Sequence, residues 1–310
     1  MSPGLSYPSL KCVLEHVEAN KRICLASRSP TVQRFEKTIP LRINFLELRT
    51  IGIQINDVIY VTGIICFEDF KGIGFINEKT RYKYLGVAPI ELDSDERYSK
   101  MSCRLFEERA LIQVGLLRPN TYWCIRNVPE NFKIYTKNVV TVSDIKEEDI
   151  SLIDTGCFPL DKLEMRVIRN SETYQLPAVK TAKKLVLMRI KGDQFLRSYS
   201  ILENPVAVFP RLESDDSVLN VVESWVKNQQ TSGIRFFETA GNNEKLLDKI
   251  MQKFGGSHVE LEVPDERMIP SSKCVRISTS STSSLLFYGS FIENCENKIF
   301  LKMEAESHII

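Results

Sequence analysis

The chain has 310 residues, of which 43% are hydrophobic and 26% are charged, and its formal net charge is +1. This is the balance of a folded globular protein, so it argues against a disordered chain. General nucleic-acid binders need a basic excess to neutralise phosphates, and the near-neutral charge lacks one, so we expect no nucleic-acid partner.

We also expect no membrane partner. Residues 58–67 are uncharged but number only about half of the roughly 20 residues that a spanning helix needs. Charged residues at positions 11, 15 and 18 interrupt the place of a signal peptide. The eight cysteines are scattered without a CxxC pair, and we interpret them as reduced thiols of a cytoplasmic or nuclear protein.

The first forty residues predict three short helices. In the first, apolar residues recur at helical spacing, and Pro8 suits its first turn. Ile23 marks the second helix, and Ser29 and Pro30 form the N-cap and first position of the third, which Pro40 ends. The apolar positions of the first helix are Leu10, Val13, Leu14 and Val17.

Residues 41–150 predict a strand-rich region, because apolar and β-branched residues begin to alternate at Leu41. The charged residues from 86 to about 100 indicate a loop instead of a regular element. The expected strands are residues 41–45, 51–55, 58–67, 122–125 and 139–142.

Residues 151–310 predict short strands and two amphipathic helices. The helix at 217–227 has Asp215 or Asp216 as its cap, and the helix at 244–254 ends at Gly255. The expected strands are 162–168, 184–190, 234–238, 259–263, 274–278, 285–292 and 298–303. The fold class is therefore α+β, with the segments 1–40, 41–150 and 151–310 as domains and the two helices packed on a sheet in the C-terminal half.

A possible internal repeat lies in the second half. Similar phrases begin at Leu163 and Leu185, 22 residues apart, and Val206 follows at about the same interval. This interval lies in the range of leucine-rich repeats, but the asparagine-bearing consensus is absent. The sequence leaves open whether the segment is a repeat array.

No catalytic, cofactor or metal site is expected. The chain contains neither a P-loop nor a GxSxG elbow, and the pair Gly72 and Gly74 lacks the third glycine of a dinucleotide fingerprint. His16, His258 and His308 are isolated, and no cysteine and histidine ligands cluster. We therefore interpret the protein as a non-enzymatic binding protein.

The N-terminal segment resembles an F-box. Leucine and other apolar residues fall at the spacing of that motif, although Ser6 stands where proline is usual and the tryptophan of the third helix is absent. Over nearly its full length the chain also looks like a large nematode family that joins an F-box-like start to an uncharacterised domain. The phrases that carry this resemblance are residues 5–14, 20–23, 27–30, 39–41, 158–163, 182–185 and 222–226.

The resemblance implies a substrate-recruiting subunit of a Skp–cullin ubiquitin ligase. The first helices would bind a Skp-type adaptor protein, and the rest of the chain would select an unknown protein substrate. A segment of forty residues buries too little apolar surface to be stable alone. The alternative is therefore an interaction domain whose N-terminal helices pack on its own core. The residues expected to bind the adaptor are Leu5, Leu10, Val13, Leu14 and Val17.

Overall fold

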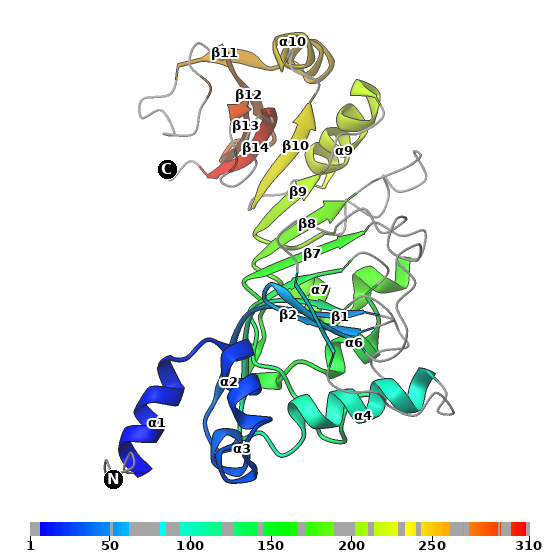
Figure 1. The fold of residues 1–310 in the computed structure, drawn as a ribbon. Helices are drawn as coiled ribbons and strands as arrows, with labels where there is room; N and C mark the ends of the chain where they lie inside the picture. Colours follow the sequence, from blue (N-terminus) through cyan, green and yellow to red (C-terminus); the bar gives the residue numbers. More distant parts are fainter. Residues whose placement is uncertain are drawn as a thin grey trace. The chain divides into compact units, whose positions relative to one another are not determined.

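The structure is a computed structural model of the chain, and its contacts divide the chain into two compact units, residues 1–158 and 159–310. It confirms the α+β class: short N-terminal helices lead into strand-rich units that carry further helices (Figure 1). The domain boundaries predicted from the sequence stay predictions. The structure describes residues 7–49, 52–61, 81–84, 94–119, 127–141, 145–166, 171–188, 202–209, 214–228, 233–239, 243–260, 269, 273–290, 292 and 299–307.

The first unit begins with the three predicted helices, α1 to α3. The Oγ of Ser29 accepts a hydrogen bond from the backbone N–H of Val32, and Pro30 occupies the first turn, so the predicted start of α3 is confirmed. The helices of this unit are α1 (Tyr7–His16), α2 (Ala19–Ala26), α3 (Pro30–Lys37), α4 (Ser94–Phe106), α6 (Glu147–Ser151) and the 3-10 turn η2 (Thr155–Cys157).

The strands of the first unit follow the order β6-β5-β1-β2-β3-β4. The β1–β5, β5–β6 and β3–β4 pairs are parallel, whereas β1–β2 and β2–β3 are antiparallel. Buried and exposed residues alternate along the first part of β1 and of β5, as one covered and one open face require. The strands are β1 (Leu41–Arg49), β2 (Gly52–Ile55), β3 (Val58–Val61), β4 (Arg81–Tyr84), β5 (Ile112–Pro119) and β6 (Asn138–Val140).

The predicted loop at 86–100 is wrong over its last part, because α4 begins at Ser94. Its buried residues recur at helical spacing, which the abundant charges of the segment concealed. They are Tyr98, Met101, Ser102, Leu105 and Phe106. Residues 62–67, 72, 74, 86–93 and 122–125, for which strands, a turn and a loop were predicted, lie outside the described residues.

The second unit has the strand order β7-β8-β9-β10-β14-β13-β12-β11. Its strands are β7 (Lys162–Arg166), β8 (Lys184–Met188), β9 (Val206–Phe209), β10 (Ile234–Thr239), β11 (Ser257–Val259), β12 (Cys274–Ser278), β13 (Ser283–Ser290) and β14 (Ile299–Ser307). Its helices are η3 (Ser171–Gln175), α7 (Pro177–Thr181), α9 (Asp215–Lys227) and α10 (Asn243–Phe254).

The two amphipathic helices of this unit pack as predicted. Trp225 of α9 and Leu247 and Ile250 of α10 are fully buried, and α10 contacts β12 and β13. The cap of α9 is Ser214, whose Oγ accepts from the N–H of Ser217, so the predicted aspartate cap is wrong. Gly255 has φ +72° after α10, which is the left-handed position that favours glycine.

The interval of 22 residues is the register of a parallel sheet. Lys162 pairs with Lys184 and Lys184 with Val206, so equivalent residues of the three phrases are aligned. The three strands β7, β8 and β9 lie side by side in Figure 1. Two rows across β7–β10 face the buried side. The first row is Leu163, Leu185, Ala207 and Arg235, and the second is Met165, Leu187, Phe209 and Phe237. Each unit of 22 residues, a strand with its connection, thus adds one strand to a continuous core.

Two buried polar side chains, Asn204 and Arg235, bind carbonyl groups of the connections that lead into these strands. Asn204 lies 22 residues after Ala182, and its Nδ2 donates to the carbonyls of Val179 at 2.7 Å and Ala182 at 2.9 Å. The guanidinium of Arg235 lies 4.5 Å from the Trp225 ring centroid and donates to the carbonyls of Asn204 and Leu202. Burial lowers the pKa of Arg235 to about 10. These side chains satisfy carbonyls that the strands leave without partners.

Five cysteines are free thiols: Cys12, Cys24, Cys103, Cys157 and Cys274. The other three cysteines lie outside the described residues. None of the helices in the described ranges combines the length and the apolar character that a membrane span requires.

Asn204 gives a first prediction. Asn204→Ala leaves buried carbonyls without donors, at a cost of about 1–3 kcal/mol in the free energy of unfolding. Asn204→Asp places a carboxylate against the same carbonyls and should cost more at neutral pH. Urea unfolding measures both. The control is Asn220→Ala, a change at an exposed position of α9. Equal small effects for all three variants would show that the Asn204 side chain does not stabilise the connection before β8.

Asp149 of α6 gives a second prediction. Burial raises the pKa of its carboxyl group from 3.8 to about 6, while the N–H of Lys146 donates to it at 2.9 Å. Because the folded pKa is raised, the folded state favours the protonated acid, and stability falls as pH rises from about 4 to about 6. The loss should be on the order of 2 to 3 kcal/mol.

Asp149→Asn removes this titration and retains a side-chain acceptor. Its free energy of unfolding relative to the parent should therefore grow as pH rises over the same interval. Thermal melts at a series of pH values provide the comparison, and a difference that does not change with pH would contradict the raised pKa.

Candidate protein-interaction site

The N-terminal helices are held to the sheet of the first unit by a polar anchor at the start of α2. The carboxylate of Glu18 caps α2 and accepts from the Asn56 amide at 2.6 Å. The Asn20 amide donates to the carbonyl of Ile55 at 3.0 Å and accepts from the Tyr60 hydroxyl at 2.8 Å. Because Asn56 turns the chain between β2 and β3 with φ +52°, α2 is fixed to that turn.

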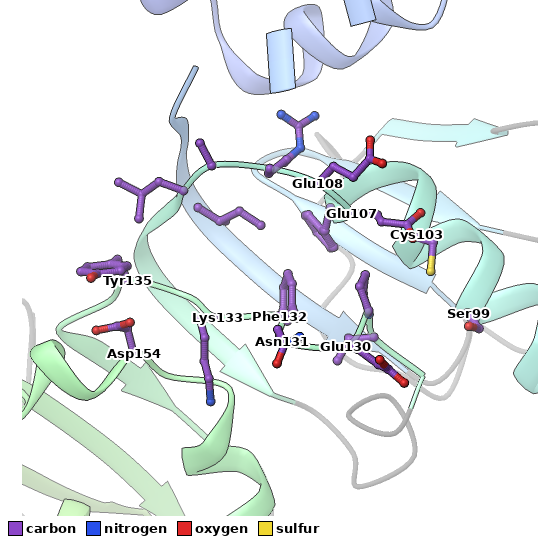
Figure 2. Close-up of a pocket in the computed structure, with 17 residues that line it drawn as sticks. Ser99, Cys103, Glu107, Glu108, Glu130, Asn131, Phe132, Lys133, Tyr135 and Asp154 are labelled. Atoms are coloured by element: carbon purple, nitrogen blue, oxygen red, sulfur yellow. The ribbon is translucent and has the colours of Figure 1, made fainter. Parts of the chain in front are cut away.

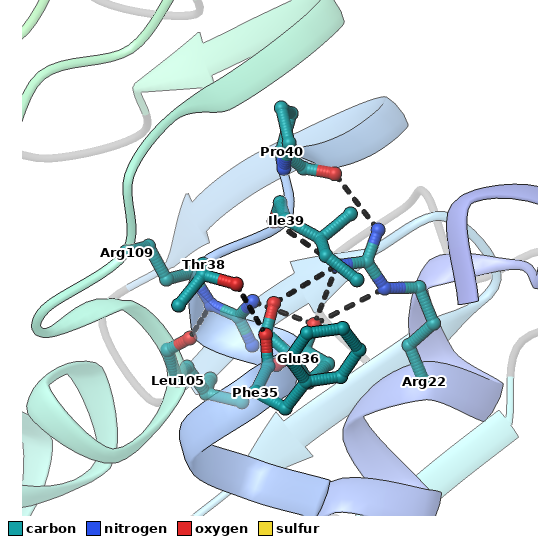
Figure 3. Close-up of polar contacts among 8 residues, drawn as sticks. All are labelled: Arg22, Phe35, Glu36, Thr38, Ile39, Pro40, Leu105 and Arg109. Carbon is teal, nitrogen blue, oxygen red and sulfur yellow. Dashed lines mark hydrogen bonds and ion pairs between the residues drawn. The ribbon is translucent and has the colours of Figure 1, made fainter. Parts of the chain in front are cut away.

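A buried ionic cluster ties α2 and α3 to the residues after α4 (Figure 3). One oxygen of Glu36 lies 2.9 Å from Nη2 of Arg22 and 2.7 Å from Nη1 of Arg109. All three side chains are at most 3% exposed. Arg22 also donates to the carbonyls of Pro40 at 2.8 Å and Ile39 at 3.1 Å, the two residues where the helices give way to β1.

The cluster holds two guanidinium groups against one carboxylate. Burial lowers the pKa of Arg22, the neighbouring Arg109 lowers it further, and the Glu36 carboxylate opposes both. Removal of the Glu36 carboxylate would leave two buried cations without a counter-charge. Glu36 is therefore the residue on which the cluster depends.

The five residues predicted to bind an adaptor do not form one exposed face. Leu14 is only 2% exposed and packs with Phe35 and Ile39, with Leu10 partly buried against them. Val17 is also partly buried, whereas Val13 is 47% exposed, and Leu5 lies outside the described residues. Among the described residues, Val13 is therefore the one member of the predicted set whose side chain is exposed.

Leu25 on α2 is the exposed apolar residue that the predicted set omitted. It is 45% exposed, next to the buried pair formed by Arg22 and Ile23. The helical spacing of a short segment does not decide which side faces the sheet. That side is fixed by the buried polar residues Asn20 and Arg22, which a search for apolar stripes does not weigh.

A polar hollow of about 780 Å³ lies beside the end of α4 in the same unit (Figure 2). The carboxylates in its lining belong to Glu107, Glu108, Glu130 and Asp154. Asp154 accepts a hydrogen bond from the Tyr135 hydroxyl, and this carboxylate raises the pKa of Tyr135. Of the cations in the lining, Arg109 is bound to Glu36, and Lys133 donates to the Ser151 carbonyl. The hollow suits polar or cationic groups more than anions.

Residues 93–239 match the model of a protein family described as a domain of unknown function, DUF3557. The matched segment runs from α4 through β5 to β10, so it includes neither the N-terminal helices nor the strands β1 to β4. No curated protein matches the chain.

The ionic cluster gives a third prediction. Glu36→Gln should lower the free energy of unfolding by about 3–5 kcal/mol, since it leaves two buried guanidinium groups without a counter-charge. Urea unfolding of the full chain measures the loss.

The control is Glu108→Gln, whose carboxylate lies 3.5 Å from Lys37 but is 78% exposed. An exposed ion pair contributes at most about 1 kcal/mol. Similar small losses for the two variants would mean that the cluster does not hold the helices in place.

Proposed function

We propose that the protein is a non-enzymatic, substrate-recruiting adaptor whose N-terminal helices bind a Skp-type adaptor of a cullin ubiquitin ligase. The observation that carries this proposal is the exposure of Val13 and Leu25. The large hydrophobic residues that stand exposed in the described part of the chain are these two and Tyr135. Two of the three thus belong to the segment that resembles an F-box.

The anchoring of α2 and α3 supports the same proposal. A docking helix binds best when its apolar side chains are presented by a rigid support, because less freedom is lost on binding. The cluster around Glu36 and the Asn20 contacts supply such a support below Leu25. Burying a Val or Leu side chain contributes about 1.5–3 kcal/mol, so two such residues are a useful part of an interface.

A second candidate function is favoured by the burial of Leu14. Its contacts with Phe35 and Ile39 are those of a helix that packs on its own chain. In this alternative the protein is an interaction domain whose N-terminal helices complete its own core, and its partner binds elsewhere. Both candidates agree with the predicted cytoplasmic or nuclear location.

Our fourth prediction separates the two candidates. Val13→Asp and Leu25→Asp should each weaken binding to a purified Skp-type adaptor by about tenfold or more, with unchanged folding, because both side chains are already exposed. Leu14→Asp should instead lower the melting temperature, since it buries a carboxylate among apolar residues.

Tyr135→Asp is the matched control, because it changes an equally exposed residue outside the N-terminal helices. It should leave adaptor binding unchanged. Calorimetry measures binding and circular dichroism measures folding. If the unmutated chain binds no Skp-type adaptor, the ubiquitin-ligase proposal is wrong and the second candidate stands.

A further inference from the structure

An open row of side chains crosses the parallel strands of the first unit. Arg42 of β1 pairs with Gln113 of β5, and Gln113 forms a parallel bridge with Tyr135. All three residues are exposed, whereas Leu41, Ile43 and the other alternate positions face the core. The row therefore lies on the face of this sheet that the described residues leave uncovered.

A second row lies two residues further along the same strands. It consists of Asn44, Gly115 and Lys137, by the registers that join β1 to β5 and β5 to the chain after Tyr135. A Cβ atom at Gly115 would lie 2.8 Å from the Asn44 carbonyl oxygen, so no side chain can stand there. The two rows line a groove of about 430 Å³, which we call the two-row groove.

The charge of the two-row groove has one sign. Arg42 and Lys137 line it, and no carboxylate does so among the described residues. Lys137 donates to the Cys157 carbonyl at 2.9 Å and Asn138 to the Gly115 carbonyl at 3.1 Å, so this side of the groove is held in place. The neighbouring hollow is acidic, and Tyr135 lines both.

The residue types are those that dominate protein interfaces. Tyrosine and arginine are enriched among the residues that carry most of the binding energy, and Tyr135 is 42% exposed. At the usual strand spacing, Arg42 and Tyr135 stand two strands apart, roughly 10 Å. An extended segment repeats its side chains on one face about every 7 Å, so successive side chains of one segment can reach the aromatic ring and a cation.

We propose that the two-row groove binds an extended acidic segment of a partner protein, whose carboxylates pair with Arg42 and Lys137 beside the ring of Tyr135. The inference rests on the proposed function, since it assigns the surface and the chemical class by which the adaptor recruits its substrate. Carboxylates that pair with arginine form strong, charge-assisted hydrogen bonds.

An acidic protein segment fits this groove better than a nucleic acid does. Nucleic-acid binding needs many cations along the phosphate backbone, whereas the two-row groove holds two in a chain of net charge +1. The amide groups of Asn44 and Gln113 can serve the peptide bonds of an extended segment.

The test is selection of a random-peptide phage library on the full chain. Selected peptides should be enriched in Asp and Glu, and one of them, synthesised with a fluorescent label, should bind about tenfold or more weakly to the Arg42→Glu, Lys137→Glu double variant. Lys180→Glu, an exposed reversal in the second unit, is the matched control and should bind as the parent does. Peptides selected on the double variant should be enriched in Lys and Arg instead.

The proposal is overturned if the library yields no acidic enrichment, if the double variant binds as the parent does, or if Lys180→Glu weakens binding equally. It is also overturned if a single-stranded oligo(dT) competes with the peptide at equal or lower concentration. Should the double variant melt at a lower temperature, Gln113→Glu alone, at the centre of the first row, should reproduce the loss. Adaptor binding by the same variants stays intact, so failure here is distinct from failure of the proposed function.

Discussion

The carboxylate of Glu36 is the charge on which the start of the molecule depends. It is shared by Arg22 and Arg109, one from the N-terminal helices and one from the chain that enters β5. Since this single anion is the counter-charge for two buried cations, its loss would leave both arginines uncompensated in the interior. The N-terminal helices and the sheet of the first unit are thereby one folded body.

This constraint decides which side of α2 faces the sheet. Arg22 and Asn20 of α2 point inward, Arg22 to Glu36 and to the carbonyls before β1, and Asn20 to the turn between β2 and β3. The outward side of α2 is then free to carry Leu25. The usual arrangement of an amphipathic helix is partly inverted here, because the buried side of α2 includes Asn20 and Arg22 and its exposed side includes Leu25.

The sequence predicted the helices and strands well where local signals agree. Ser29 and Pro30 marked the start of α3, and Gly255 the end of α10. It failed at α4, where charges outnumber the buried positions, and it could not pair Arg22 with Glu36 or Arg109, because contacts between distant segments leave no local periodicity. The exposed face of β1 and β5 was hidden as well, since no strand was predicted at Ile112–Pro119, and the alternation of β1 shows which residues share a face but not which strand lies beside it.

The 22-residue register of β7, β8 and β9 has a consequence for how such a chain can change in length. An insertion in a connection leaves Leu163, Leu185 and Ala207 in one row, because the strands keep their own alignment. One residue inserted within β8 would move Val186 to the core side and turn Leu185 outward, since side chains alternate with period two. Related chains can therefore gain or lose whole units of a strand and its connection, or lengthen their connections. Single-residue insertions and deletions within a strand would not be tolerated.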